Sequence, residues 1–534
     1  MKSGRLFAGA MALTSAALIW LASPGGGETS FFSIFMLLPL FVGVASQIDG
    51  RAKWAPAFFR GWLCGFASYL TLLYWIVFVL EHYGALPWFV AVPALMLLAA
   101  YMAVYTGLFA AGFSFLWPRG PSPAPTLCLL AAPALWVGLD WLRGWLFSGF
   151  PWMDIGYFLA FSPRLIQCAD IFGHHGITYL IVMVNVFVML AGMMLLSKRR
   201  KATGGWTLAR ILSIVAAILL FAHIYSDWRL DSLWTASPPR MRLGVVQGNI
   251  SQEMKWSPEN RETTLSGYLR QSEDLLRKEQ PALLLWPETA LPFFPQRSPL
   301  TAELHAFTAW TGVPVLSGAP WFTPDADTDK GVRLYNGAAL FTPDGRFDAT
   351  YFKSHLVPFG EYVPLRRYLP FIAPLVETVG QFSAGQVEKP INWDKARIGV
   401  LICYESVFPD IARAWVGAGA NVLVNLTNDA WYGRSSAPRH SLAMAVLRAV
   451  ETRRGLARAA NTGFSVFITP KGEMRQLSPL FAPWAAVDDV VLNDARTIYV
   501  RFGYLFAPAC LFFALLALAA AWQRQKKTAR KLCL

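Results

Sequence analysis

The chain has 534 residues, of which 55% are hydrophobic and only 15% charged, and its formal net charge is +14. This composition is too apolar for an ordinary soluble protein, so much of the chain is expected to lie in lipid. The basic charge does not indicate nucleic-acid binding. Residues 240–501 hold 28 Lys and Arg against 25 Asp and Glu, which leaves +11 of the +14 on the apolar remainder.

Eight apolar runs approach or exceed the roughly 20 helical residues that a membrane crossing needs. They lie at residues 5–22, 31–47, 57–80, 88–117, 124–146, 176–197, 206–225 and 503–522. The sequence therefore predicts a membrane domain of seven helices over residues 1–230, a polar domain over residues 240–500, a C-terminal transmembrane helix and a basic tail at 523–534. The first run is alternatively a cleavable signal peptide, which would not move the polar domain across the membrane.

The loops between these runs predict the orientation, because Lys and Arg accumulate on the cytoplasmic side. The following basic residues all fall on one side: Lys2, Arg5, Arg51, Lys53, Arg119 and the run 198–201. The opposite loops, 23–30 and 81–87, contain no Lys or Arg. We therefore expect both termini in the cytoplasm, and the polar domain on the periplasmic face of a bacterial inner membrane.

The polar domain is predicted to be a layered α/β domain. Its apolar runs are short, rich in β-branched residues and bounded by Gly, Pro, Asn or Asp, as in RLGVVQGN, RIGVLICYE and FSVFITPKG. Helical stretches separate several of them, for instance residues 262–278 and 441–460. Alternation of this kind favours helices layered on sheets.

Only one of the six cysteines, Cys403, falls in the polar domain, so no disulfide framework is expected there. Cys403 is either a buried spectator or a reactive nucleophile. No Cys or His spacing suggests a metal site, and His355 and His440 are assigned no catalytic role. We expect neither a metal nor a diffusible cofactor.

Three predicted strands end in reactive side chains: Glu288 after LLLW, Lys353 after ATYF, and Cys403 after RIGVLI. A cysteine nucleophile needs a base to take its proton, and a carboxylate can serve when burial raises its pKa. An ammonium group can stabilise the developing oxyanion. A surface carboxylate and a solvated lysine are the simpler alternatives for Glu288 and Lys353.

This order of Glu, Lys and Cys at strand ends resembles the nitrilase superfamily, whose domains are αββα sandwiches. With the flanking membrane spans, the strings LRGW, GFPW, VQGN, WPE, VPFGE, CYE and NDAW make the whole chain resemble the apolipoprotein N-acyltransferase family. The resemblance implies ping-pong transfer of the sn-1 acyl chain of a phospholipid, through a thioester on Cys403, to the N-terminal amine of a diacylglyceryl-apolipoprotein. We expect a monomer with no nucleic-acid partner.

The resemblance also assigns supporting roles. Glu361 would orient Lys353, while Tyr404 and Glu405 would support the site; each carboxylate is alternatively a structural acceptor. Trp256 would lie near substrate, although packing is its simpler role. Asn428, Asp429 and Trp431 follow a strand and are expected in the pocket wall, or as turn residues with an aromatic plug.

Two further hypotheses concern lipid contact. The apolar stretch 368–382 contains two prolines and does not resemble a core strand. It is either core packing or a lid on the bilayer that exposes Phe371 and Leu375. Arg143, at the outer end of the fifth run, either anchors that helix end or contacts a phospholipid phosphate.

Two other classes remain as alternatives. A membrane-anchored amidase or nitrile hydrolase would use the same residues with water as acceptor, although the apolar stretch and the spans argue against a soluble substrate. A scaffold or transporter would carry an incomplete triad and ionisable residues within its spans. No GxSxG string is present, which disfavours a serine hydrolase of the nucleophile-elbow type.

Overall fold

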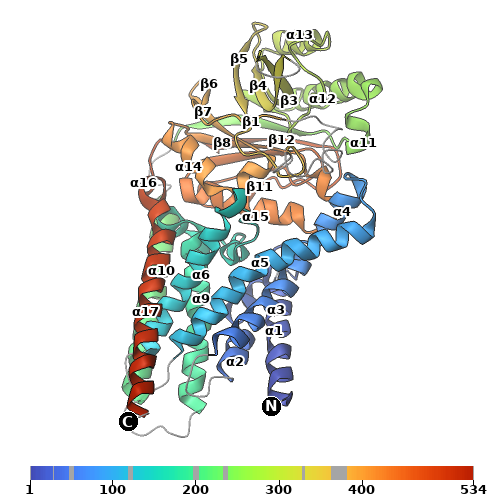
Figure 1. The fold of residues 1–534 in the computed structure, drawn as a ribbon. Helices are drawn as coiled ribbons and strands as arrows, with labels where there is room; N and C mark the ends of the chain where they lie inside the picture. The colour runs from blue at the N-terminus through green and yellow to red at the C-terminus, as the bar shows by residue number, and fades with distance from the viewer. Residues whose placement is uncertain are drawn as a thin grey trace. The chain divides into compact units, whose positions relative to one another are not determined.

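The computed structural model describes residues 2–27, 29–46, 53–117, 124–196, 204–232, 238–326, 331–362 and 382–532. The chain divides into two compact units, whose elements are labelled in Figure 1. The first unit, the membrane unit, comprises Met1–Val77, Pro87–Ser232 and Arg501–Leu534. The second, the catalytic unit, comprises Phe78–Leu86 and Leu233–Val500.

Long apolar α-helices make up the membrane unit (Figure 1): α1 (Lys2–Ala22), α3 (Trp54–Leu72), α5 (Trp88–Leu116), α6 (Ala124–Arg143), α9 (His174–Leu196), α10 (Gly204–Ser232) and α17 (Phe506–Leu532). Its shorter α-helices are α2 (Leu38–Ala45), α7 (Pro163–Ile166) and α8 (Ala169–Phe172). Two further short helices, α4 (Trp75–His82) and α16 (Ile498–Phe502), each belong partly to this unit and partly to the catalytic unit. Single-turn 3-10 helices complete the membrane unit: η1 (Ser30–Ile34), η2 (Leu146–Ser148), η3 (Ile155–Leu159) and η8 (Gly503–Leu505).

The number of spans differs from the eight expected from the sequence. Within the described residues, six helices are long and apolar enough to cross a membrane, or seven if α3 and α4 form one span bent by 54°. The predicted run 31–47 forms η1 and the short α2 instead of a full-length helix. Apolar composition alone does not reveal such a break, because both arrangements bury the same side chains.

Glycines bring helices of the membrane unit into close contact. Gly61 and Gly65, one turn apart on α3, face α5: a Cβ at Gly61 would lie 2.3 Å from the Thr106 carbonyl oxygen. A Cβ at Gly138 of α6 would lie 2.8 Å from Leu511 Cα, so α17 packs on α6 despite its distance along the chain. Small residues of this kind let transmembrane helices approach closely enough to gain van der Waals contact.

Two six-stranded sheets form the centre of the catalytic unit. The first has the order β12-β1-β2-β3-β4-β5 and the second β11-β10-β9-β8-β7-β6. Their strands are β1 (Arg240–Gln247), β2 (Leu283–Leu285), β3 (Val315–Pro324), β4 (Val332–Phe341), β5 (Phe347–Phe352), β6 (Ile391–Trp393), β7 (Ala396–Ile402), β8 (Val422–Thr427), β9 (Gly455–Ala460), β10 (Val466–Ile468), β11 (Met474–Arg475) and β12 (Trp484–Val491). β1, β2 and β3 are parallel, as are β7, β8 and β9, and the remaining pairs are antiparallel.

Helices cover the outer faces of both sheets, which confirms the predicted αββα sandwich. Helices α12 (Arg261–Leu276) and α13 (Thr301–Thr311) pack on the first sheet through a buried apolar cluster. Helices α14 (Pro409–Gly417) and α15 (Ala437–Thr452) accompany the second, where Trp415 packs over Gly399 of β7. The remaining short helices are α11 (Gln252–Lys255), η4 (Pro258–Asn260), η6 (Cys403–Val407) and η7 (Asp429–Tyr432).

The apolar cluster under the first sheet fixes the strand that leads to the candidate site. Trp286, directly after β2, is fully buried and stacks on Tyr268 of α12 with ring centroids 5.1 Å apart. Its indole N–H donates to Ser272 Oγ at 3.0 Å. A buried tryptophan whose one polar atom is satisfied provides a rigid anchor two residues before Glu288.

Candidate catalytic site

Glu288 is held in place by the neighbouring strand. It follows β2, whose three residues are all buried. Gly318 of β3 lies directly against it: a Cβ there would be 2.6 Å from Glu288 Cα and 2.4 Å from the Thr289 nitrogen. Any other residue at position 318 would displace this main chain, so the absence of a side chain at Gly318 sets the position of the carboxylate.

The two carboxylate oxygens of Glu288 have different surroundings. Oε1 accepts a hydrogen bond from Asn336 Nδ2 at 2.8 Å and lies 3.5 Å from Lys353 Nζ. Oε2 is buried and has no hydrogen-bond partner among the described residues. Leaving a buried carboxylate oxygen unpaired costs stability. Such unpaired polar atoms are often found in groups that take part in a reaction. Oε2 is therefore the atom free to accept a proton.

Lys353, directly after β5, is only 1% exposed. Its Nζ lies 3.0 Å from Glu361 Oε1 and 3.0 Å from Oε2. Burial lowers the pKa of Lys353, but the carboxylates of Glu361 and Glu288 outweigh it and raise the pKa above the ordinary value. Asn336 Nδ2 donates to Glu361 Oε1 at 2.8 Å as well as to Glu288, so one amide links the two carboxylates that hold the ammonium.

Cys403 begins the 3-10 turn that follows β7, and its φ of +49° is unusual for a residue with a side chain. Backbone strain of this kind persists where surrounding structure enforces it, often at active sites. Burial and the charge of Glu288 raise the pKa of the Cys403 thiol to about 12, and Lys353 opposes them. The thiol is therefore protonated at neutral pH and needs a base before it can attack.

Glu405 ties the lysine loop to the cysteine turn and is fully buried. Its Oε1 accepts hydrogen bonds from Tyr351 Oη at 2.6 Å and from the nitrogen and Oγ of Ser354 at 2.7 Å each. Its Oε2 accepts from the Ile402 nitrogen at 2.7 Å. The His355 nitrogen donates to Oε1 as well, at 3.3 Å. With these five donors, Glu405 acts through the backbone and hydroxyl groups of the loops, whereas Glu361 contacts Lys353 itself.

Tyr404 lies on the aromatic side of the cysteine turn. Its ring packs against Phe408, with centroids 5.0 Å apart, and against His355 at 5.9 Å. Burial lowers the pKa of His355 to about 4, so this imidazole is neutral at physiological pH. Tyr404 thus lines the turn next to Cys403 as part of a largely apolar cluster.

The loop after β8 carries the residues expected in the pocket wall. Asn428 Nδ2 donates to Gln252 Oε1 at 2.7 Å, which joins this loop to α11. Asp429 pairs with the buried Arg458, with Arg458 Nη2 at 2.9 Å from its Oδ2. Trp431 is half-buried and meets Tyr83 edge to face at 4.8 Å. Both the predicted wall and the alternative of turn chemistry with an aromatic plug fit these positions.

Two predicted residues of the apolar stretch, Phe371 and Leu375, lie outside the described residues. Trp256, directly after α11, is half-buried, and its indole nitrogen has no hydrogen-bond acceptor in the described part of the chain. Packing alone would leave this N–H unsatisfied, and a polar group of a bound substrate would satisfy it.

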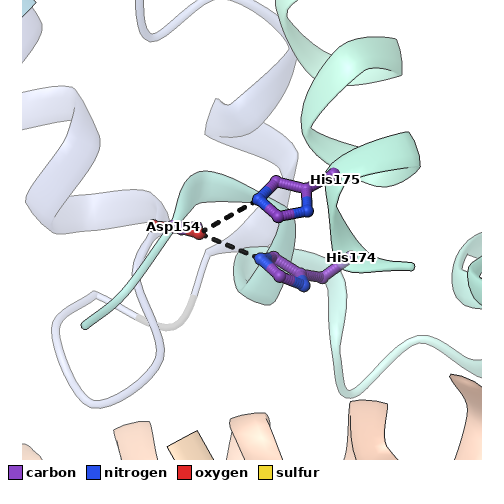
Figure 2. Close-up of side chains that lie close together, drawn as sticks. All are labelled: Asp154, His174 and His175. Atoms are coloured by element: carbon purple, nitrogen blue, oxygen red, sulfur yellow. Dashed lines mark hydrogen bonds and ion pairs between the residues drawn. The ribbon is translucent and has the colours of Figure 1, made fainter. Parts of the chain in front are cut away.

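Arg143 belongs to the membrane unit and lies in a buried ionic cluster. Its Nη2 is 3.1 Å from Asp140 Oδ1 and also contacts Asp154 Oδ1. Figure 2 shows His174 and His175 directed at the same carboxylate, with Nε2 atoms 2.9 and 4.0 Å from Asp154 Oδ2. Asp154, His174 and His175 have the composition of a metal site. However, the guanidinium already compensates Asp154, so protein groups alone account for the cluster. Arg143 is 2% exposed and its Nε has no hydrogen-bond partner among the described residues, so the predicted phosphate contact stays a prediction.

Two buried residues of the site, Asn336 and Lys255, were not predicted from the sequence. Asn336 lies inside β4, and Lys255 ends α11 with its Nζ donating to the Glu288 carbonyl oxygen at 2.9 Å. Neither follows a predicted strand, whereas Glu288, Lys353 and Cys403 each do. An Asn within an otherwise apolar strand, and a Lys beside the predicted Trp256, were the available signals.

The site brings together a carboxylate, an ammonium group and a thiol. Glu288 Oε2 is available as a base, Lys353 is a charged donor for an oxyanion, and Cys403 lies within the electrostatic influence of both. This combination suits acyl transfer or hydrolysis through a thioester.

The fold and this arrangement of Glu, Lys and Cys define the catalytic unit as a carbon-nitrogen hydrolase domain, and residues 242–496 match the family model of that description. Residues 15–187 match the model of the apolipoprotein N-acyltransferase N-terminal domain. The chain belongs to the apolipoprotein N-acyltransferase family, with both characteristic parts present.

Relatives match nearly the whole chain. An apolipoprotein N-acyltransferase of Geobacter metallireducens is 37% identical over 519 residues, which cover 96% of this chain and 95% of the relative. One of Methylococcus capsulatus is 33% identical over 477 residues, with 88% and 89% covered. Among solved structures, Nit3 of Saccharomyces cerevisiae, a member of the nitrilase superfamily, is 18% identical, covers 47% of this chain and 90% of its own, and gives a TM-score of 0.36.

Proposed function

We propose that this chain is a phospholipid:apolipoprotein N-acyltransferase. It moves the sn-1 acyl chain of a phospholipid, through a thioester on Cys403, to the N-terminal amine of the diacylglyceryl-cysteine of an apolipoprotein. Family membership supports the overall reaction. The observation that carries the mechanism is the unpaired, buried Glu288 Oε2 in a site that also holds Lys353 and the protonated Cys403.

In the first half-reaction, Glu288 Oε2 takes the thiol proton and Cys403 Sγ attacks the ester carbonyl carbon. Lys353 stabilises the oxyanion of the tetrahedral intermediate. When the intermediate collapses, the C–O bond breaks and the glycerol oxygen takes the proton from Glu288. The products are a lysophospholipid and an acyl-thioester.

In the second half-reaction, the neutral amine of the apolipoprotein attacks the thioester carbonyl and gives a proton to Glu288. Cleavage of the C–S bond releases the amide, and the sulfur of Cys403 takes the proton back. The enzyme therefore returns to its starting state without a cofactor. The same carboxylate acts as base and then acid in each half, as microscopic reversibility requires.

The location of the reaction is part of the proposal. Residues 240–500 lie on the periplasmic side of the inner membrane, both termini are cytoplasmic, and one chain suffices for activity. The distribution of Lys and Arg between the loops supports this orientation. An outward-facing site would meet both the outer leaflet and exported apolipoproteins.

Intact mass spectrometry of the detergent-solubilised full chain tests the acyl-enzyme. The chain is incubated with a phospholipid whose sn-1 and sn-2 chains differ in mass. We expect a hydroxylamine-sensitive gain of the sn-1 acyl mass in the wild type and in the control Cys510→Ala, but not in Cys403→Ala. A gain of the sn-2 mass, or an adduct that persists in Cys403→Ala, would contradict the mechanism.

The acceptor is tested by adding a diacylglyceryl-cysteine peptide to the isolated acyl-enzyme. We expect the acyl mass to leave the protein and appear on the peptide, and an N-acetylated peptide to be inert. Release to water at the same rate with either peptide would favour the membrane-anchored amidase or hydrolase alternative.

A further inference from the structure

Lys255 is a buried lysine with no role in the mechanism above. It is 1% exposed, although lysine is among the residues least often buried. Its Nζ donates to the carbonyl oxygen of Glu288 at 2.9 Å, and no carboxylate oxygen pairs with it in the described part of the chain. A buried ammonium without a paired carboxylate costs stability, which makes it a candidate for function.

The turn that carries Lys255 contacts two loops of the site. Lys255 holds the main chain of Glu288, while Gln252, at the start of the same short helix, accepts a hydrogen bond from Asn428 at 2.7 Å. The turn thus joins the loop after β2, in the first sheet, to the loop after β8, in the second. Movement of Lys255 would be transmitted directly to Glu288.

The net charge of the site would also be balanced by a second cation. Glu288 and Glu361 contact Lys353, so two carboxylates share one ammonium and this group is net negative by one. A net negative group opposes a thiolate or an oxyanion. A charged Lys255 would bring the sum to zero before the reaction begins.

We propose that Lys255 is a positioning residue for Glu288, which fixes its main chain and adds the positive charge that Lys353 alone does not supply. This inference rests on the proposed thioester chemistry at Cys403. The acidic groups that act electrostatically on Lys255 are Glu288 and Cys403. The positive charge of Lys255 therefore interacts with both the base and the nucleophile.

The ionisation of Lys255 gives the proposal a pH signature. Burial lowers the pKa of Lys255 to about 8, and the charges of Glu288 and Cys403 only partly oppose it. Because the charged form is the protonated one, its contribution is present below about pH 8 and is lost as the pH rises further. An arginine at this position would keep its charge throughout this range.

Alkylation of Cys403 by iodoacetamide tests the proposal without a phospholipid. The rate is followed by peptide mass spectrometry on the full chain in detergent, from pH 6 to 10. Four proteins are compared: wild type, Lys255→Met, Lys255→Arg and the exposed control Lys278→Met. Acyl-enzyme formation from phospholipid is measured on the same samples.

We expect Lys255→Met to slow both reactions of Cys403 at pH 7 by about 10- to 100-fold, the range for a displaced catalytic group. Lys255→Arg should stay within about threefold of the wild type below pH 8, and the ratio of wild type to Lys255→Arg should fall above pH 8 as lysine loses its charge. The control should match the wild type.

Equal alkylation rates of Lys255→Met and wild type would overturn the proposal. A constant ratio of wild type to Lys255→Arg across the pH range would overturn the role of the charge, even if Lys255→Met does not fold. Failure of the proposed function looks different: the wild type would alkylate with the expected Lys255 dependence but take no acyl chain from phospholipid.

Discussion

At the scale of single residues, a single side-chain amide serves two carboxylates of the site. One amide group, Asn336 Nδ2, donates to both Glu288 and Glu361. These two carboxylates in turn hold Lys353. The position of the base and the charge of the oxyanion donor therefore both depend on a residue that takes no part in proton transfer.

Replacing Asn336 with leucine should impair both functions at once. In Asn336→Leu, two buried carboxylates lose a donor and repel each other, so we expect acyl-enzyme formation to slow by about 100-fold. The rate is measured by quenched-flow mass spectrometry. The control Glu388→Gln alters an exposed residue of the same unit and should behave as wild type. A rate unchanged in Asn336→Leu would show that Lys353 and Glu361 suffice to place Glu288.

The raised pKa of Cys403 predicts a pH dependence that separates the thiol from its base. With a pKa of about 12, the thiolate fraction rises about tenfold per pH unit throughout the range from pH 6 to 10. In Glu288→Gln, alkylation of Cys403 should follow this slope, because no base remains. The wild type should react faster at pH 7 and with a shallower slope. Identical profiles would exclude Glu288 as the base.

At this scale, the sequence predicted which residues follow a strand, while the catalytic roles of these residues stay predictions. Glu288, Lys353 and Cys403 come after β2, β5 and β7, and the hydrophobic strands before them mark their positions in the sequence. Asn336 and Lys255 could not be found in this way, since their importance arises from contacts across the fold. The difference between Glu361 and Glu405 also depends on which donors face each carboxylate, and spacing does not encode this.

At the scale of helices and strands, contacts between helices depend on glycine. The α3–α5 crossing leaves no room for a side chain at Gly61, where a Cβ would lie 2.5 Å from Ala110 Cβ. Gly192 of α9 offers a matched comparison, because no described atom other than its chain neighbours and the nearby backbone of its own helix lies within 4 Å of its Cβ position. The two sites differ in packing but share helical geometry.

We expect Gly61→Val to destabilise the membrane unit by about 1–3 kcal/mol, the range for overpacking, while Gly192→Val has a much smaller effect. Thermal unfolding in detergent, followed by tryptophan fluorescence, measures both. Equal unfolding temperatures for the two variants would show that the α3–α5 contact does not depend on close approach.

The sequence predicted where most helices and strands lie better than it predicted where a helix breaks or bends. Apolar runs marked most of the membrane helices, and alternating strands and helices marked the layered domain. The break within residues 31–47 and the bend between α3 and α4 were not predicted, since hydropathy averages over the residues where a helix ends. The contact between α17 and α6 joins segments far apart in sequence, which periodicity cannot reveal.

At the scale of the whole molecule, the proposed orientation predicts which sites a membrane-impermeant maleimide reaches. Lys278 and Lys527 are both exposed and belong to the catalytic and membrane units respectively. In cells with a permeabilised outer membrane, Lys278→Cys should be labelled and Lys527→Cys should be labelled only after lysis. Peptide mass spectrometry separates these sites from the native cysteines. The reverse pattern would place the catalytic unit in the cytoplasm.

The catalytic unit is not one continuous stretch of chain, because it includes Phe78–Leu86. Within it, Tyr83 Oη donates to the Ala430 carbonyl at 3.0 Å and the Tyr83 ring covers Trp431. A gene fragment that encodes only residues 238–500 would therefore produce a domain with an uncovered aromatic surface beside the loop after β8. To obtain the domain as a soluble protein, one would have to graft this nine-residue peptide back, by fusion or as a separate chain.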